Sequence, residues 1–533
     1  MIKNWKYVLG IVSSFAVTSA YSQSLKDAQQ ATDLERYRNA INNLQTINRS
    51  SPSEEAALSL ADAYLKVGKP DSAAIYLNQA AANPKSEVGM VAAGKAALLK
   101  GNASAAEEQF EKAIKASKKK DPNIYMLIAQ AYVDANVKDP TKAIEYINRA
   151  NELTKNNNAE AYITLGNIHQ LSPNGGGPAM TAYDRAVQID SKNAKAHFKR
   201  GQLFVRSRNY NEAQSALQAA LAANPNYAPA YRELGEMYYF AGKYDQALEN
   251  YRKFTSMAEN TSETRAKFAS FLFLTKDYAG TIKEAQEVLK RDPNNQVMNR
   301  VLAYSLYETD KNEEAIKAME NYFKVADQSK ILGSDYAYYG RMLAQAGKND
   351  LAQTNFDKAL QLDPENTELM DDIASFYAKQ KSYDKAIPLY TKILDSNPKS
   401  PNVVRIKLAN TYFENKQYDQ ADPLYASVLT TNPTYVPALV QRAEIIDAKD
   451  TDKSGDAKNA YEEVIKVINQ DPAKQQSYKG TLVAINYKLG FYAYQAKDYT
   501  NARKNWSEVL RLDPGNKEAT QGIKSIDAMQ RRK

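Results

Sequence analysis

One spacing of residues recurs along the whole chain and constrains its fold more than any other feature. Residues 231–254 show it most clearly, with large, small and aromatic side chains at fixed offsets: Leu234, Gly235, Tyr238, Gly242, Tyr244, Ala247 and Tyr251. Similar ladders return roughly every 34 residues, which is the period of a helix–turn–helix repeat. One such unit cannot bury its apolar face alone, so neighbouring units must stack. The ladder therefore predicts an all-α solenoid with an extended binding surface.

The offsets have physical reasons. Gly or Ala midway along the first helix lets the second helix approach closely, and the aromatic residue fills the space that remains. Asp-Pro or Asn-Pro, as at Asn224-Pro225 and Asp363-Pro364, ends most units because proline does not continue a helix. This pattern resembles the tetratricopeptide repeat (TPR) family over nearly all of residues 25–515. The resemblance implies a right-handed α-solenoid of about fourteen units whose first helices line a concave face that receives partner segments.

Departures from the pattern predict the domain organisation. The junction at residues 321–335 is longer than the others, so we expect an N-terminal TPR block over residues 23–330 and a C-terminal block over 331–515. Residues 470–488 extend a linker into a long first helix. Residues 516–533 read as an amphipathic capping helix that covers the apolar face of the last repeat.

The N-terminus is typical of an export signal. Lys3 and Lys6 precede a short apolar run at residues 7–17, and Ala20-Tyr21-Ser22 matches a cleavage site that would leave Gln23 as the mature start. The chain contains no cysteine, so no lipobox follows the signal and we do not expect a lipoprotein. We predict a periplasmic protein without a membrane span after cleavage, and the sequence resembles exported proteins of Bacteroidetes-type bacteria.

Charge and residue types exclude several functions. The formal net charge of +8 is small for 533 residues, and its interspersed charges do not favour nucleic acid as a partner. With only His169 and His197 and no cysteine, a zinc site or a Cys/His nucleophile is poorly supplied. We therefore expect no enzyme, cofactor or metal site.

Two loops look like ligand sites at first. Residues 174–177 (Asn-Gly-Gly-Gly) lack the Gly-Lys-Ser/Thr of a phosphate loop, so we interpret them as a lengthened turn. Residues 450–456 resemble the start of a calcium loop, but its twelfth position is Tyr461 instead of a bidentate glutamate. A polar inserted turn is favoured there, and calcium binding by residues 450–463 stays open.

The concave groove is the remaining candidate site. By register, its basic, aromatic and amide lining residues are Lys195, Lys199, Arg232, Arg300, Tyr304, Tyr338, Arg341, Lys407 and Asn410. We predict a non-catalytic scaffold that binds protein segments in this groove, for an envelope assembly, secretion or transport complex. The alternative is a carbohydrate- or peptidoglycan-associated binding protein. The ladder position of Trp506 counts against that alternative, because sugar sites favour exposed aromatic residues.

Overall fold

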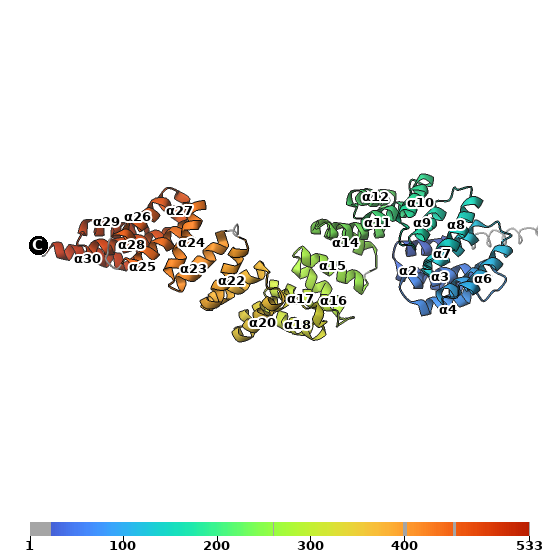
Figure 1. Ribbon diagram of the computed structural model, residues 1–533, viewed down its shortest axis with the longest axis horizontal. Helices are drawn as coiled ribbons and strands as arrows, with labels where there is room; N and C mark the ends of the chain where they lie inside the picture. The colour runs from blue at the N-terminus through green and yellow to red at the C-terminus, as the bar shows by residue number, and fades with distance from the viewer. Residues whose placement is uncertain (1–22, 260, 398–401, 451–454, 532–533) are drawn as a thin grey trace, which may run out of the picture. The chain divides into compact units, whose positions relative to one another are not determined.

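The computed structural model describes residues 23–531 apart from residues 260, 398–401 and 451–454. The predicted export signal, residues 1–22, lies outside the described residues. The described chain is helical throughout, and its helices follow one another as antiparallel pairs joined by short turns (Figure 1). The all-α solenoid of about fourteen pairs is confirmed. The chain forms two compact units, one up to Ala326 and the other from Asp327.

The first unit begins with a helix that covers residues 23–33. The helices that follow it are α2 (Tyr37–Ser50), α3 (Glu54–Lys66), α4 (Pro70–Ala80), α5 (Glu87–Leu99), α6 (Ala103–Ala116), α7 (Pro122–Asp134), α8 (Thr141–Leu153), α9 (Ala159–His169), α10 (Gly176–Ile189), α11 (Ala194–Arg206), α12 (Tyr210–Ala223), α13 (Ala228–Phe240), α14 (Tyr244–Met257), α15 (Ser262–Leu274), α16 (Tyr278–Leu289), α17 (Gln296–Glu308) and α18 (Asn312–Val325).

The second unit opens with a single 3₁₀ turn, η1 (Gln328–Lys330), inside the long junction that the sequence indicates. Its helices are α19 (Gly333–Gln345), α20 (Asn349–Leu362), α21 (Thr367–Lys379), α22 (Tyr383–Ser396), α23 (Asn402–Glu414), α24 (Tyr418–Thr431), α25 (Val436–Lys449), α26 (Asp456–Asn469), α27 (Pro472–Ser477), α28 (Lys479–Gln495), α29 (Tyr499–Leu512) and α30 (Lys517–Gln530). The short α27 and the 17-residue α28 form the predicted extended entry to the last pair.

Local sequence sets where the helices begin and end. Several first helices begin after an asparagine whose side chain accepts a backbone hydrogen bond, as Asn193 does from the Ala196 amide at 2.9 Å. Several second helices end where an Asx-Pro step leaves the helical conformation, as α12 does at the C-cap Asn224 and α20 at the C-cap Asp363. The turn within a pair takes a positive φ, supplied by glycine at Gly242 (φ 71°) and by other residues elsewhere.

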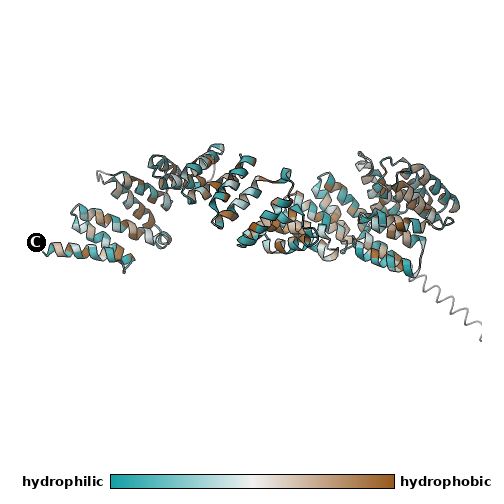
Figure 2. Ribbon diagram, turned by 90° about the horizontal axis from the view of Figure 1, so that it is seen from below, coloured by the Kyte–Doolittle hydropathy of each residue, from teal (hydrophilic) through white to brown (hydrophobic). Residues whose placement is uncertain are grey.

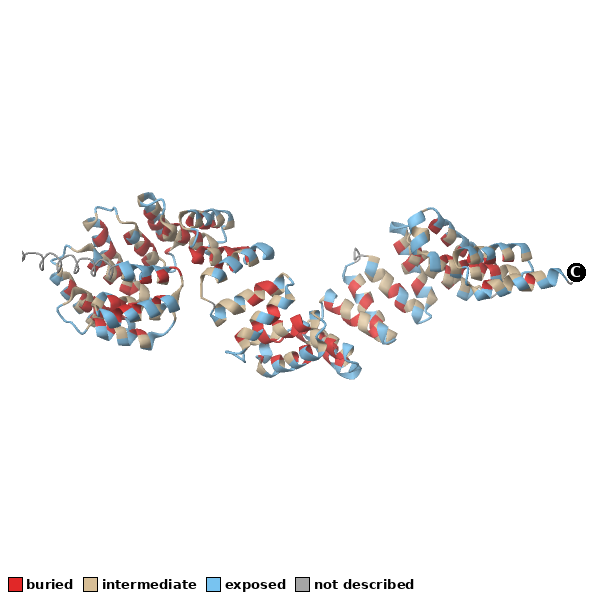
Figure 3. Ribbon diagram, turned by 180° about the vertical axis from the view of Figure 1, so that it is seen from behind, coloured by how far each residue is buried: buried red, intermediate tan, exposed pale blue. Residues whose placement is uncertain are grey.

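The core lies between the helices of each pair and between neighbouring pairs. Figure 3 shows buried residues on the sides of the helices that face one another and exposed residues outside, and Figure 2 shows the matching hydropathy. A Cβ added to Gly166 would overlap the ring of Tyr183, so this glycine is required by the close approach of α9 and α10. At the end of the array, α30 packs on α29 and covers Trp506, so the predicted cap is present.

First helices also contact the first helices of neighbouring repeats. This is seen along α3, α5, α7, α9, α11 and α13 in the first unit and along α19, α21 and α23 in the second. Helices approach one another more closely on the inside of a curved stack. The first helices therefore form the inner face of each unit, and the predicted groove residues belong to it.

Candidate functional site: the inner face

Two predicted groove cations of the first unit already have carboxylate partners. Lys195 Nζ on α11 lies 2.6 Å from Glu160 Oε1 and 3.4 Å from Asp33 Oδ1. The Arg232 guanidinium on α13 holds Glu35 in a bidentate ion pair, with Nη2 2.8 Å from Oε1 and Nε 3.1 Å from Oε2. Burial opposes the charged form of both cations, but these carboxylates raise the pKa of each. Two of these carboxylates, Asp33 and Glu35, come from the first repeat.

The segment that supplies them is the N-terminal corner, which we define as residues 33–39, where the first helix turns into α2. Leu34 is 8% exposed and belongs to the apolar cluster of α11–α14 that includes Phe198 and Tyr227. Arg36 Nε donates to the carbonyl of Met257 at 3.2 Å, and the Asn39 amide donates to Glu259 Oε1 at 2.8 Å. The corner therefore lies on the inner face at α11–α14, about 200 residues further along the chain.

Lys199, one turn after Lys195, is in a different situation. Its Nζ lies 3.2 Å from the amide oxygen of Gln202 and 5.7 Å from the centroid of the Phe198 ring. Burial, together with the nearby cations of Lys195 and Lys66, lowers the pKa of Lys199 to about 8. The first unit thus carries a half-buried lysine whose charged form is disfavoured.

Arg300 and Tyr304 both lie on α17 and are used in packing. Arg300 Nη2 donates to the hydroxyl of Tyr322 at 2.5 Å, and its guanidinium lies 5.1 Å from the centroid of that ring. Tyr304 is 7% exposed and packs against Phe273, with the ring centroids 6.0 Å apart. Tyr304 therefore offers little surface to a ligand.

In the second unit the predicted residues join neighbouring repeats. Arg341 pairs with Asp372 and covers the Tyr338 ring, with the guanidinium 4.8 Å from its centroid. Lys407 Nζ lies 2.6 Å from Asp371 Oδ2. Burial raises the pKa of Asp372, and the Arg341 cation opposes that shift. The predicted groove cations Arg341 and Lys407 are thus paired with carboxylates of α21, from α19 and α23 respectively.

Asn410 shows a second use of the inner face. It is exposed, and its Oδ1 accepts a hydrogen bond from the hydroxyl of the ladder residue Tyr425 at 2.6 Å. Ladder tyrosines of other repeats reach inner-face groups in the same way, as Tyr183 reaches Asn167 at 2.9 Å and Tyr461 reaches Asp447 at 3.1 Å. Tyr251 differs, because its hydroxyl is buried and has no hydrogen-bond partner among the described residues.

Sequence reasoning missed the most buried charges of the inner face. Lys95 on α5 is 2% exposed and pairs with Asp62 of α3 and Asp134 of α7, with Nζ 2.5 Å from Asp134 Oδ2. Burial opposes the charge, but both carboxylates raise the pKa of Lys95. A lysine in the otherwise apolar helix 87–99, with aspartates in the first helices before and after it, is the signal that could have revealed this triad.

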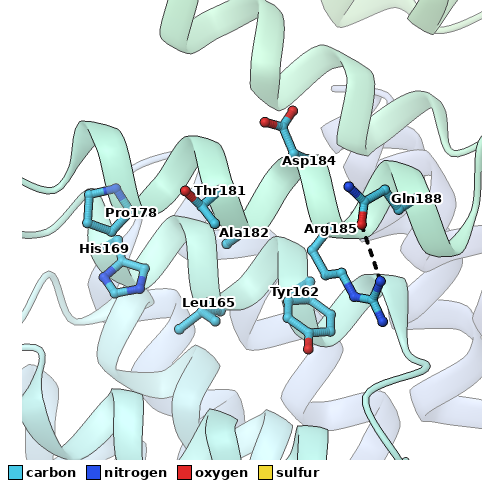
Figure 4. A pocket seen from close by; sticks show the side chains of 9 residues that line it. All are labelled: Tyr162, Leu165, His169, Pro178, Thr181, Ala182, Asp184, Arg185 and Gln188. Atoms are coloured by element: carbon cyan, nitrogen blue, oxygen red, sulfur yellow. Dashed lines mark hydrogen bonds between the residues drawn. The ribbon is translucent and has the colours of Figure 1, made fainter.

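A cavity of about 550 Å³ lies between α9 and α10 and is lined by His169, Tyr162 and Arg185 (Figure 4). Burial lowers the pKa of His169, as expected for a packing histidine. The charged side chains at the rim are already engaged, because Arg185 donates to Gln188 at 3.2 Å and Asp184 pairs with Arg200 at 2.7 Å. We interpret the cavity as a seam within one repeat.

The described residues hold no group of three or more His, Cys, Asp or Glu side chains placed to bind a metal ion. The possible calcium loop falls partly on residues 451–454, which lie outside the described part of the chain. Gly455 takes φ 95° directly before α26. Trp506 is 3% exposed and donates to the carbonyl of Tyr487 at 3.2 Å, so it is a core residue and offers no platform for a sugar.

Three family models match the chain, and two of them are described as tetratricopeptide repeats. Two general TPR models match residues 25–87 and 91–162, and residues 343–409 and 377–444. A third, described as the N-terminal ARM repeat of tetratricopeptide repeat protein 21, matches residues 135–248. The chain belongs to the tetratricopeptide repeat family, whose members are typically non-catalytic scaffolds for protein–protein interaction.

Curated relatives are distant. A TPR repeat-containing protein of Methanocaldococcus jannaschii is 23% identical over 275 residues, which are 51% of this chain and 44% of that protein. A DnaJ protein P58IPK homologue of Arabidopsis thaliana is 22% identical over 34% of this chain and 40% of its own length. The chain thus spans less than half the length of these curated relatives.

Solved structures give a similar picture. The C-terminal part of a TPR repeat-containing protein from Cytophaga hutchinsonii is 29% identical, covers 48% of this chain and 99% of its own, and has a TM-score of 0.44. The type IV pilus biogenesis factor PilW is 20% identical over 40% of this chain and 98% of its own, with a TM-score of 0.34. None of the described helices has the length and apolar character needed to cross a membrane.

Proposed function

We propose that this TPR protein is an exported scaffold that binds segments of other envelope proteins on its inner face and carries out no chemistry itself. The observation that carries the proposal is the inner face of the first unit, which already holds a peptide segment. The N-terminal corner is held there by buried Leu34, by the carboxylates of Asp33 and Glu35, and by two hydrogen bonds. The Arg36 side chain and the Asn39 backbone amide donate these hydrogen bonds. A surface that binds a turn of its own chain has the chemistry to bind a turn of a partner.

The periplasmic location rests on the sequence. Lys3 and Lys6, the apolar run at residues 7–17 and the small residues before Gln23 support export, and the absence of cysteine supports a protein without a lipid anchor. An exported chain without disulfides depends on packing alone, which a long stack of repeats provides. Secretion, outer-membrane assembly and energised transport are the envelope processes that such a scaffold would serve.

Export is tested with two reporter fusions. Residues 1–60 and residues 23–60 are each fused to alkaline phosphatase, which is active only after export, and are produced in a Gram-negative host. We expect phosphatase activity from the longer fusion alone. Equal, low activity of both fusions would refute export.

Partner binding is tested by site-specific photocrosslinking in the native host. The crosslinking residue is placed at Asn410, which is exposed on the inner face, and in a matched control at Asp395, which is exposed on the second helix α22. We expect a discrete protein adduct from position 410 that is absent from position 395. Identical adduct patterns, or none from either position, would contradict partner binding on the inner face of the second unit.

A further inference from the structure

The contact made by the N-terminal corner is small and mixed in character. Its apolar part is the single residue Leu34, and its polar part consists of the Asp33–Lys195 and Glu35–Arg232 ion pairs and the hydrogen bonds donated by Arg36 and Asn39. The side chains of Arg232 and Glu35 are 22% and 21% exposed, so their pairing is partly screened by solvent. A contact of one leucine, two partly screened ion pairs and two hydrogen bonds forms within the chain and is small enough for a partner to displace.

Backbone strain weakens the corner further. Glu35 has φ 59°, a left-handed conformation that the corresponding turns of other repeats also adopt, with glycine at Gly242 and with lysine at Lys276. A side chain in that region costs roughly 1–2 kcal/mol. The Glu35 carboxylate nevertheless sits on Arg232 in a bidentate geometry, so the strain is offset by the ion pair. A segment that presents the same carboxylate without the strain would bind better.

The site also contains a hydrogen-bond donor that the corner does not use. A cavity of about 550 Å³ adjoins the corner and is lined by Glu35, Tyr37, Arg232 and Tyr251, among others. The Tyr251 hydroxyl is buried and has no hydrogen-bond partner among the described residues, although its counterparts Tyr183, Tyr425 and Tyr461 are all paired with inner-face side chains. A buried hydroxyl without a partner costs about 1–3 kcal/mol, which a ligand acceptor would recover.

We propose, building on the scaffold function above, that the inner face of α11–α14 is a receptor for an acidic partner segment in which a leucine is flanked by two carboxylates. In the free protein, Asp33-Leu34-Glu35 of the N-terminal corner occupies this receptor in cis. The leucine enters the Phe198 and Tyr227 cluster, the carboxylates pair with Lys195 and Arg232, and a further acceptor of the partner reaches the Tyr251 hydroxyl. The partner therefore binds by displacing the corner.

The test uses a fluorescent peptide of residues 30–40 (QATDLERYRNA), which presents the same leucine and carboxylates in trans. It is titrated into the full mature chain and into the opened double variant Leu34→Ala/Glu35→Ala, with anisotropy as the readout. We expect the opened variant to bind the peptide at least tenfold more tightly than the unmodified chain, because the cis segment no longer competes. A matched peptide with alanine at the positions of Leu34 and Glu35 should not bind.

Two further variants separate the outcomes. Adding Arg232→Glu to the opened variant should abolish peptide binding, whereas adding Arg442→Glu, on α25 of the second unit, should leave it unchanged. Circular dichroism confirms that each variant is folded. No peptide binding by a folded opened variant, or equal binding by the unmodified chain, would overturn the receptor. A dimer of the unmodified chain that Arg232→Glu dissolves would also overturn it, since a second copy would then be the occupant.

This experiment is independent of the crosslinking experiment above. If the peptide fails to bind while position 410 still captures a partner, the scaffold function stands and only the acidic receptor is refuted. If the peptide binds while position 410 captures nothing, the receptor stands and the inner face of the second unit has no partner.

Discussion

The two units build their inner faces from the same kinds of residue but connect them over very different distances. In the first unit, the Arg232–Glu35 pair joins residues 197 positions apart. In the second unit, Lys407–Asp371 and Lys488–Asp447 join residues 36 and 41 positions apart, and each pair links the first helices of neighbouring repeats. The first unit is thus closed on itself by its N-terminal corner, whereas the ion pairs described in the second unit hold neighbouring repeats together.

The burial of the paired charged side chains also differs between the two units. In the first unit, Lys95 and Asp134 are 3% and 5% exposed at their side chains, whereas Lys407 and Asp371 of the second unit are 34% and 29% exposed. Removing one member of a buried pair leaves an uncompensated charge, while partly exposed pairs are screened by water. The same inner-face chemistry therefore fixes structure in the first unit and contributes much less to it in the second.

The largest expected effect comes from breaking the buried triad. Lys95→Met removes the cation between Asp62 and the buried Asp134 and leaves only the exposed Lys66, 3.5 Å from Asp134, to compensate their charge. We expect the first unit to lose about 3–5 kcal/mol of stability. The matched change Lys407→Met in the second unit should cost less than about 1 kcal/mol. Urea unfolding followed by circular dichroism, with hydrogen exchange to assign the loss to each unit, measures both. Similar losses of stability in the two variants would show that the burial of the Lys95 ion pairs does not make them contribute more than the Lys407 pair.

Sequence reasoning predicted the repeats but not the closure, for a physical reason. Leu234, Gly235 and Tyr251 pack within one repeat, and the same pattern of residues recurs along the chain, so the repeats can be counted from the sequence. The cap formed by α30 and the junction near residue 327 follow from where that recurrence stops. The inner-face residues could be placed by register. Their roles as binding residues remain predictions.

The register of the repeats did not predict which residue pairs with each charged side chain of the inner face. Glu35 lies at the positive-φ turn position, which glycine occupies in some repeats and lysine or another residue in others, and nothing in the local pattern connects it with Arg232 almost six repeats later. That contact depends on how the curvature of the intervening repeats accumulates. Small differences in the angles between packed helices decide the curvature, and the spacing of residues in the sequence does not predict these angles.

A charge exchange at the N-terminal corner tests the closure that distinguishes the first unit. Arg232→Glu places a fourth carboxylate beside Glu35, Glu233 and Glu236, so we expect the corner to detach and at least a tenfold shift toward the open form. The double variant Arg232→Glu/Glu35→Arg restores opposite charges and should close again. Because the chain has no cysteine, fluorophores on cysteines introduced at positions 38 and 252 report the opening by energy transfer.

The control is the equivalent exchange in the second unit. Asp371→Lys/Lys407→Asp keeps the pair but reverses it, and should leave the energy transfer between positions 38 and 252 unchanged. Unchanged transfer in Arg232→Glu would show that the Glu35 ion pair does not hold the corner. Failure of the double variant to recover would show that the orientation of the pair, and not only its charge, is needed.

A smaller effect is expected at Lys199. Burial disfavours the charged form of this lysine, whereas two carboxylates stabilise the charged form of Lys95. The folded pKa of about 8 lies below the usual 10.5, so the unfolded chain binds more protons between these values and stability rises with pH across that window. Below pH 8 the full penalty applies, and Lys199→Met should stabilise the first unit by about 1–2 kcal/mol at pH 7. Lys195→Met, which removes the partner of Glu160 and Asp33, should destabilise it.

Melting temperatures at pH 7 and pH 10 measure this difference. The gain from Lys199→Met should shrink as the pH rises from 8 toward 10.5, because the folded chain then holds Lys199 in its neutral form and no longer bears the cost of a buried charge. A gain that stays constant with pH would assign it to apolar packing against Phe198 instead of to charge.

The smallest effect compares two ladder tyrosines, one from each unit. Tyr425→Phe removes a hydrogen bond to Asn410 and should cost about 0.5–1.5 kcal/mol, whereas Tyr251→Phe removes a hydroxyl with no partner among the described residues and should be neutral or slightly stabilising. Urea unfolding measures both. If the Tyr251 hydroxyl serves a bound partner, Tyr251→Phe should weaken partner binding several-fold without lowering stability, because the ligand loses a donor that the folded chain does not use. A stability loss in Tyr251→Phe equal to that in Tyr425→Phe would mean that this hydroxyl is already satisfied in the free protein, and the receptor would then lack its unused donor.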